Sequence, residues 1–328
     1  MMTTNVCCAE CGKEEGGDGG VNLKTCTSCK LVKYCNAKCQ RNHWATHKKT
    51  CKQRAAELRD EALFKDPPPK EDCQICFLPM TMKIICCASL PLATISSVPI
   101  DDFAKTKVNL ANEDMEQYFT CCGKSICRGC FYSIIVSNFE VAAKCPFCNA
   151  DQANKTVEAR VEELSKRVEA LDAGAICQLG SWYYHGREGV QQDWTKAMEL
   201  YTRAAALGNR RACYNLADAY YRRGDLNKAR FHTEAAAMAG DEVSRHNLGC
   251  LDENSGNIER AIKHWTISSS AGYNSSMHNL LIALEKGHVR KESIDSTLKA
   301  YNNSCAEMRS EARDNYIQTM AMTISLSF

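Results

Sequence analysis

Several features that would indicate other classes of protein are absent from this chain of 328 residues. The longest run without a charged residue or histidine, Ile84–Ile100, has 17 residues and is broken by Pro91 and Pro99, whereas a membrane helix needs roughly 20 apolar residues. The first residues show no basic segment followed by an apolar run, as a secretory signal peptide would. No glycine-rich phosphate loop or nucleophile–base arrangement is visible. We therefore expect an intracellular protein without a membrane span.

Cysteine is scarce in the second half of the chain and abundant in the first. Of the 22 cysteines, eight precede residue 52 and ten lie between residues 73 and 148. Because intracellular thiols stay reduced, closely paired cysteines favour metal sites over disulfides. The first half is therefore predicted to hold metal modules. The second half must be stable through ordinary packing, with four isolated cysteines as small apolar side chains: Cys177, Cys213, Cys250 and Cys305.

The middle of the chain contains three CxxC pairs and one adjacent pair. Two residues between thiols form a tight turn that directs both sulfurs at one tetrahedral zinc ion. Four such half-sites make two complete zinc sites. The eight thiols are Cys73, Cys76, Cys121, Cys122, Cys127, Cys130, Cys145 and Cys148.

The order of these pairs resembles an all-cysteine RING domain over residues 73–148. The resemblance implies a cross-brace, in which alternate pairs share a zinc ion. In RING ubiquitin ligases the positions of Ile75 and Pro146 help to form a shallow apolar groove that receives a ubiquitin-conjugating enzyme. The implied sites are Cys73, Cys76, Cys127 and Cys130 for one ion, and Cys121, Cys122, Cys145 and Cys148 for the other.

The chain departs from the RING pattern at three places. Cys121 and Cys122 are adjacent, whereas RING domains usually separate these two ligands and often place a histidine there. Cys86 or Cys87, in the 44-residue segment between Cys76 and Cys121, is an alternative ligand. Asn149 stands where many active ligases carry an arginine that holds ubiquitin.

A second cysteine-rich module occupies residues 8–51. Its last two ligand pairs have three intervening residues, which places both ligands on one face of a helical turn and predicts short helices there. Together with Tyr34 and Trp44, the pattern closely resembles a MYND finger. The resemblance implies interleaved sites. Cys8, Cys11, Cys35 and Cys39 would hold one zinc ion, and Cys26, Cys29, His47 and Cys51 the other.

Cys7 is an alternative to Cys8, although the family spacing favours Cys8. With four protein ligands at each ion, no coordination position is left for catalysis. MYND fingers bind short, often proline-containing peptides, so the resemblance implies a peptide partner. Tyr34 and Trp44 are expected to pack the small core of the finger.

The two modules together predict four Zn²⁺ ions. Ligating cysteines bind as thiolates. Deprotonating 15 cysteines and adding four divalent ions would change the formal charge from +2 to −5. Because the metal-loaded protein would be acidic and no basic helix accompanies either module, we expect no nucleic-acid partner. Residues 52–72 are predicted to be a linker, helical at first and stopped by Pro67–Pro69.

The second half of the chain repeats every 32 residues. Ala205–Gly208, Ala237–Gly240 and Ser269–Gly272 recur at this interval, which is typical of a helical solenoid. Residues 173–316 resemble Sel-like repeats, relatives of the tetratricopeptide family, and the resemblance implies a curved scaffold that holds a protein partner. Residues 317–328 would form a tail. Leu216, Leu248 and Leu280 keep the same 32-residue interval.

Residues 154–172 are predicted to form one amphipathic helix between the zinc modules and the repeats. Its apolar residues recur at spacings of four and three, which traces one stripe. This stripe is expected to cap the first repeat; a homodimeric coiled coil is the alternative. The stripe consists of Val157, Val161, Leu164, Val168 and Leu171.

The sequence thus predicts a multidomain protein, with two small zinc-stabilised cross-brace modules followed by an all-α helical repeat solenoid. Two functions are compatible with it. In the first, a RING-type ubiquitin ligase recruits a conjugating enzyme and selects substrates through its MYND finger and repeats, without a covalent catalytic residue. In the second, all the modules bind proteins and the chain is a non-catalytic adaptor. Of the two, the sequence slightly favours the ligase.

Overall fold

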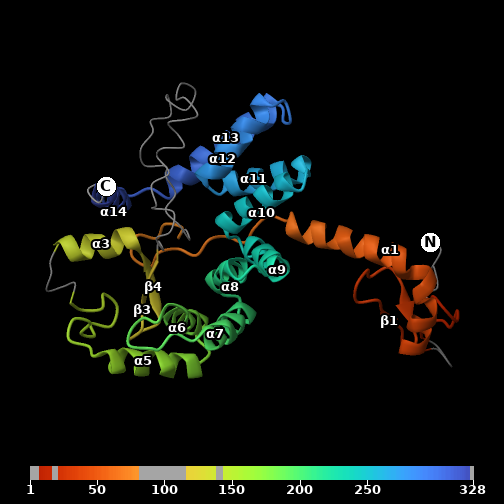
Figure 1. The fold of residues 1–328 in the computed structure, drawn as a ribbon, viewed down its shortest axis with the longest axis horizontal. Helices are drawn as coiled ribbons and strands as arrows, with labels where there is room; N and C mark the ends of the chain where they lie inside the picture. Colours follow the sequence, from red (N-terminus) through yellow and green to blue (C-terminus); the bar gives the residue numbers. More distant parts are fainter. Residues whose placement is uncertain (1–6, 17–20, 81–115, 138–142, 326–328) are drawn as a thin grey trace. The chain divides into compact units, whose positions relative to one another are not determined.

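The structure, a computed structural model, describes residues 7–16, 21–80, 116–137 and 143–325. The chain forms two compact units that divide between Lys65 and Asp66, and Figure 1 shows the course of the chain. Most of the long segment between Cys76 and Cys121, including Cys86 and Cys87, lies outside the described residues. Within the described part, no helix is long and apolar enough to cross a membrane.

The first unit combines a two-stranded sheet with one long helix. Strands β1 (Lys24–Thr25) and β2 (Lys33–Tyr34) pair antiparallel, and α1 (Ala37–Leu63) follows. A core of this size cannot stabilise a fold alone and requires a metal or a disulfide. Four of its six buried residues are cysteines: Cys8, Leu23, Cys26, Cys29, Tyr34 and Cys51.

Helix α1 is longer than the sequence predicted. Short helices were expected at the last two ligand pairs, but one helix runs without a break because no proline or glycine occurs between residues 37 and 63. Asn36 caps its N-terminus by accepting a hydrogen bond from the backbone N–H of Cys39 (2.9 Å). The helix therefore includes residues 52–63, the first part of the predicted linker.

The second unit begins with the cysteine-rich module of residues 73–148. Strands β3 (Glu116–Phe119) and β4 (Lys124–Cys127) form an antiparallel hairpin, and α3 (Arg128–Ser137) follows directly. The hairpin turn contains Cys121 and Cys122. It is closed by a hydrogen bond from the N–H of Gly123 to the carbonyl oxygen of Phe119 (2.8 Å). Gly123 has φ of +71°, which glycine adopts without strain.

The rest of the second unit is a stack of antiparallel helices in which each helix from α6 to α13 packs on the next (Figure 1). A further helix precedes the stack and another follows it. In chain order the helices are α5 (Val157–Glu169), α6 (Ala173–His185), α7 (Trp194–Ala206), α8 (Arg210–Arg222), α9 (Leu226–Met238), α10 (Glu242–Asn254), α11 (Ile258–Ser270), α12 (Asn274–Glu285), α13 (Lys291–Glu307) and α14 (Glu311–Ser325).

Regular signals at the helix ends explain the regular repeat. An aspartate or asparagine side chain caps the N-terminus of each helix from α6 to α10. The glycines that end the repeated phrases have positive φ, as at Gly208 (+84°). Leu216, Leu248 and Leu280, which keep the 32-residue interval, are all fully buried. The helical solenoid predicted from the 32-residue period is therefore confirmed.

Helix α5 packs on α6 at the start of the repeats. Leu164 of the predicted stripe is fully buried beside Trp182, and Val161 and Val168 pack against the same cluster. Leu171 is 61% exposed because it lies beyond the end of α5. The stripe thus covers the first repeat, as the capping interpretation requires.

The cysteine-rich module contacts the repeats at both of their ends. Near α5 and α6, Tyr118 donates a hydrogen bond to Asp172 (2.9 Å), and Arg167 donates to the carbonyl oxygens of Thr120 and Cys121 (2.6 and 2.7 Å). At the other end, α14 packs on α3 (Figure 1). The predicted repeat boundary at residue 316 falls inside α14, which runs on to Ser325.

Residues 66–72, called the strap here, lie against the repeats. Pro68 packs on Gly240, since a Cβ on this glycine would be in van der Waals contact with the carbonyl oxygen of Pro68 (3.4 Å). Lys70 donates a hydrogen bond to the carbonyl oxygen of Ala271 (3.0 Å). The ammonium group also lies 3.8 Å from the fully buried carboxylate of Glu242.

Candidate zinc centres

The described residues contain four groups of cysteine and histidine side chains whose ligand atoms converge. In every group the four candidate atoms lie within 4.8 Å of one another. The groups are Cys8, Cys11, Cys35 and Cys39; Cys26, Cys29, His47 and Cys51; Cys73, Cys76, Cys127 and Cys130; and Cys121, Cys122, Cys145 and Cys148. The structure thus brings together each set of four that the sequence predicts.

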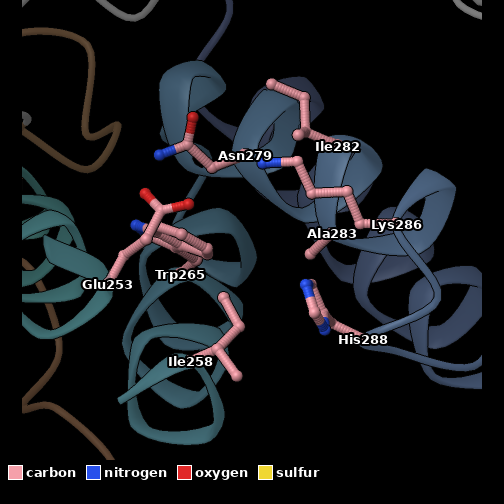
Figure 2. A pocket seen from close by; sticks show the side chains of 8 residues that line it. All are labelled: Glu253, Ile258, Trp265, Asn279, Ile282, Ala283, Lys286 and His288. Atoms are coloured by element: carbon pink, nitrogen blue, oxygen red, sulfur yellow. The ribbon is translucent and has the colours of Figure 1, made fainter. Parts of the chain in front are cut away.

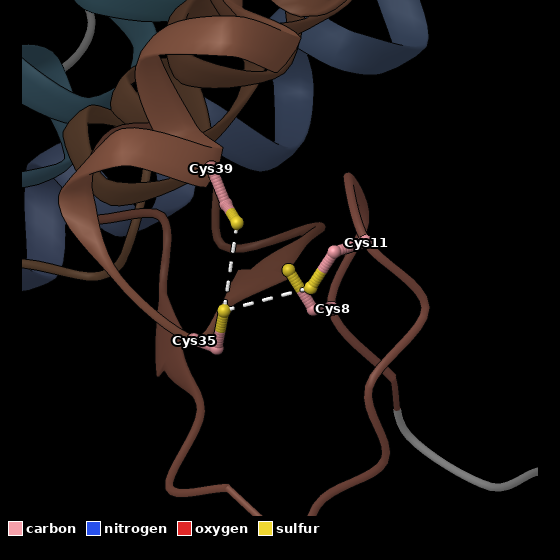
Figure 3. A group of neighbouring side chains, drawn as sticks. All are labelled: Cys8, Cys11, Cys35 and Cys39. Atoms are coloured by element: carbon pink, nitrogen blue, oxygen red, sulfur yellow. Dashed lines mark hydrogen bonds between the residues drawn. The ribbon is translucent and has the colours of Figure 1, made fainter.

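The spacing of the sulfur atoms suits a tetrahedral metal. Zinc–sulfur bonds of about 2.3 Å place two sulfurs of a tetrahedron about 3.8 Å apart. In the first group the Sγ of Cys35 is 3.6 Å from that of Cys11 and 3.5 Å from that of Cys39 (Figure 3). All twenty described cysteines are free thiols, none of them in a disulfide. The residues present therefore fit zinc.

The second group is the most enclosed, because all four of its side chains are buried. The Sγ atoms of Cys26 and Cys51 are 3.8 Å apart, and Nε2 of His47 is 3.2 Å from the Sγ of Cys29. His47 and Cys51 are four residues apart on α1, so both project from one face of the helix.

The third and fourth groups form the cross-brace of the second module. The Sγ atoms of Cys76 and Cys127 are 3.9 Å apart, and those of Cys122 and Cys145 are 3.6 Å apart. The hairpin turn allows the adjacent cysteines to point at one centre. Cys121 and Cys122 therefore both belong to the fourth group, whereas Cys86 and Cys87 lie outside the described residues.

Four of the five CxxC knuckles in the described chain share one backbone conformation; the exception is Cys127–Cys130, which runs into α3. In these four, the residue after the second cysteine has positive φ, and its N–H donates to the carbonyl oxygen of the first cysteine at 2.8–3.0 Å. This turn holds both sulfurs on one side. Two of the positions, Lys30 and Phe77, carry a side chain that is strained in this region of φ, whereas asparagine tolerates it. The four residues are Gly12, Lys30, Phe77 and Asn149.

The same knuckles favour a thiolate at their first cysteine. Burial raises the pKa of these thiols, but backbone N–H donors outweigh it, so the pKa of Cys8 falls to about 6 and the pKa values of Cys26 and Cys145 are lowered. A hydrogen bond with Cys127 lowers the pKa of Cys73 to about 4, while the same bond raises that of Cys127. Each group thus contains one sulfur that ionises readily, which assists metal binding.

The residues predicted to contact partners are exposed. Ile75 is 38% exposed on the first knuckle of the second module, and Pro146 is exposed on its last knuckle. Phe77, which follows the first knuckle, is 75% exposed, and its backbone has φ of +55°.

Trp44 is 41% exposed, so the prediction that it packs the core is wrong, whereas Tyr34 is buried as predicted. Trp44 shares a helical face with the ligands His47 and Cys51, three and seven residues further on. It still lies outside the buried core cluster of the finger, which is filled mainly by cysteine side chains.

Sequence reasoning missed the side chains around the sulfur atoms. Gln152 donates a hydrogen bond to the Sγ of Cys121 (3.3 Å), and Asn36 donates to that of Cys35 (3.2 Å). Arg313 of α14 donates to the Sγ of Cys127 (3.4 Å) and of Cys76 (3.7 Å). The capping position of Asn36 before a helix was a usable signal. No spacing in the sequence indicates Arg313, because it is 183 residues beyond Cys130.

A small pocket lies between α11 and α12 (Figure 2). Its volume of about 120 Å³ is well below the roughly 300–1,000 Å³ of small-molecule sites. We therefore assign it no ligand. It is lined by Glu253, Ile258, Trp265, Asn279, Ile282, Ala283, Lys286 and His288.

Comparison with known families identifies two of the modules. The family model of the MYND finger matches residues 8–51, and the model of the Sel1 repeat matches residues 173–209 and 210–241. The chain therefore contains a MYND finger and Sel1 repeats.

Individual relatives share only parts of the chain. A SET and MYND domain-containing protein of Dictyostelium discoideum is 44% identical over 48 residues, which are 14% of this chain and 9% of that protein. A Sel1 repeat protein from Oxalobacter formigenes is 20% identical with a TM-score of 0.40, over 55% of this chain and 71% of that one. A protective antigen of uropathogenic Escherichia coli with an SLR fold is 16% identical with a TM-score of 0.31, over 49% and 44% of the two chains.

Proposed function

We propose that this protein is a zinc-stabilised scaffold for protein–protein interaction, with two zinc ions in each cysteine-rich module. The observation that carries the proposal is the closure of all four ligand groups: each supplies four protein donors, so a bound ion has a structural role. Zinc would fix the knuckles and leave their outward side chains for partners. A reducing intracellular compartment would keep these thiols available.

The first contact surface that we propose is centred on Trp44. This side chain is exposed on α1 between the ligands Cys39 and His47, so zinc fixes the helix that carries it. An indole combines a large apolar area with a donor N–H, which makes tryptophan common among the residues that dominate binding. The proposed ligand is a short proline-containing peptide, the ligand class of MYND fingers.

The first prediction tests this surface. Peptides selected from a proline-containing library should bind the wild-type protein, and Trp44→Ala should weaken binding roughly 30-fold, the equivalent of about 2 kcal/mol. Zinc content should stay unchanged. Leu31→Ala is the matched control, because Leu31 is another exposed apolar residue of the same unit (54%). Equal affinities for wild type and Trp44→Ala, by fluorescence anisotropy, would exclude Trp44 from the contact.

A second candidate function is that of a RING-type ubiquitin ligase. What favours it is the cross-brace of the second module, whose alternate cysteine pairs converge as the RING resemblance implies. Ile75 and Pro146 are exposed on the two knuckles where a conjugating enzyme would bind. Asn149 still departs from the family's arginine, and its positive φ of 58° suits asparagine.

The second prediction distinguishes the ligase from an adaptor. Burying an isoleucine in a partner contributes about 1.5–3 kcal/mol. Ile75→Ala should therefore reduce autoubiquitination by roughly tenfold or more with an active conjugating enzyme, without loss of zinc. Leu171→Ala is a control at an equally apolar, exposed residue of the α5–α6 connection. If the wild-type protein transfers no ubiquitin with any enzyme of a broad panel, the non-catalytic scaffold is the better account.

A further inference from the structure

The C-terminal helix reaches into the third cysteine group. Arg313 of α14 is 5% exposed, and its guanidinium donates to the Sγ of Cys127 (3.4 Å) and of Cys76 (3.7 Å). The same group donates to the carbonyl oxygens of Leu78 (3.1 Å), Pro79 (2.9 Å) and Met308 (2.9 Å). One side chain thus joins two ligand sulfurs, the first knuckle and the end of α13.

Helix α14 packs tightly against the knuckle formed by Cys127 and Cys130. Gly129, between the ligands Cys127 and Cys130, lies so close to Arg313 that a Cβ on this glycine would be 2.6 Å from the Arg313 Cα. No side chain larger than hydrogen fits there while α14 keeps its place. Further along the helix, the hydroxyl groups of Tyr132 and Thr319 are 2.9 Å apart. The contact is therefore a matched surface between α3 and α14.

The charge of the site explains why an arginine is buried here. Burying a guanidinium is costly unless it is paired and its N–H groups are satisfied. A zinc ion held by four thiolates forms a complex with net negative charge, because the thiolates outweigh one divalent ion. A planar fork of N–H donors beside two of these sulfurs balances that charge and meets their lone pairs.

We propose that Arg313 is an outer positioning residue of the Cys73, Cys76, Cys127 and Cys130 site, and that zinc binding there is coupled to docking of α14. The inference rests on zinc occupying this site, as proposed above. Coupling between two events is reciprocal. Zinc therefore fixes α14 on α3, and docked α14 strengthens zinc binding. Residues that hydrogen-bond to metal ligands change metal affinity by about 10–100-fold.

The test compares Arg313→Leu and Arg313→Lys with wild type in the full chain loaded with zinc. In chelator titrations, Arg313→Leu should lose one zinc ion at a chelator concentration about 10–100-fold lower than the wild type does. The zinc affinity of Arg313→Lys should lie between those of the wild type and Arg313→Leu, since lysine keeps the positive charge but lacks the planar set of N–H donors. Arg309→Leu is the control, because Arg309 is more exposed and pairs with Asp314 (3.1 Å). Hydrogen exchange of residues 311–325 in wild type, with zinc and after chelation, gives a readout that needs no variant.

The expected result is that chelation of the wild type makes the amides of α14 exchange faster, and that Arg313→Leu shows fast exchange there even with zinc bound. Wild-type zinc affinity in Arg313→Leu, or protected α14 amides in the zinc-free wild type, would overturn the coupling while leaving the zinc site in place. A wild-type chain that binds no zinc at this site would overturn the coupling and the proposed site together. If Arg313→Leu does not fold, Arg313→Lys and the wild-type exchange experiment decide.

Discussion

Replacing Cys26 by serine should unfold the first unit of the protein. Cys26 is 4% exposed and belongs to the second ligand group, and four of the six buried residues in the core cluster of the finger are cysteines. Structural zinc contributes about 10–16 kcal/mol per site, which is as large as the whole stability of a typical domain, about 5–15 kcal/mol. Helix α1 has only three buried residues, His47, Cys51 and Leu63, so it cannot persist without the metal.

Hydrogen exchange of Cys26→Ser should therefore show rapid exchange throughout α1, with wild-type protection in α10 of the second unit, which has clusters of its own. Cys7→Ser is the matched control, because Cys7 is exposed and lies outside the four ligand groups. It should behave as wild type. Protected α1 amides in Cys26→Ser would show that the finger is held by something other than zinc.

Replacing Lys70 by methionine should destabilise the second unit by about 3 kcal/mol. The Lys70 ammonium lies 3.8 Å from Glu242, whose side chain is completely buried. Among the described residues, neither carboxylate oxygen of Glu242 has a hydrogen-bond partner. Methionine would keep the length of the stem and leave a buried charge without its counter-ion. In a unit of this size the loss corresponds to a fall in Tm of roughly 6–12 °C.

A matched series makes this prediction specific. Glu242→Gln in combination with Lys70→Met should recover most of the lost stability, since the buried charge is then removed as well. Lys65→Met is the control, because Lys65 is exposed just before the strap. Calorimetry of the wild type, the single variants Lys70→Met and Glu242→Gln, and the double variant gives the interaction free energy of the pair. Additive effects of the two substitutions would mean that the strap is not held by this charge.

The features that could be predicted from the sequence are those set by short-range spacing. A CxxC pair determines its own turn, and the resemblance to the RING and MYND families implied which pairs meet. The interval between Leu216, Leu248 and Leu280 indicated a helical solenoid because the same helix pair recurs, and all three leucines are buried. These signals needed no knowledge of distant contacts.

The features that escaped prediction depend on residues far apart in the chain. Arg313 and Cys127 are 186 residues apart, and Lys70 and Ala271 are 201 apart, so no local pattern connects them. Trp44 was misplaced because a tryptophan in a small finger suggests core packing, whereas the ligand residues fill that core themselves. Long-range polar contacts and the filling of a metal-centred core are decided by the tertiary fold.

Counting the zinc ions bound to the intact chain tests the central claim most directly. Native mass spectrometry of wild-type protein purified under reducing conditions should show four zinc ions per chain, because the described residues form four complete ligand groups. Two zinc ions, with both retained by Cys73→Ser, would contradict the metal sites of the second module and with them the account of this protein as a scaffold built on two zinc modules.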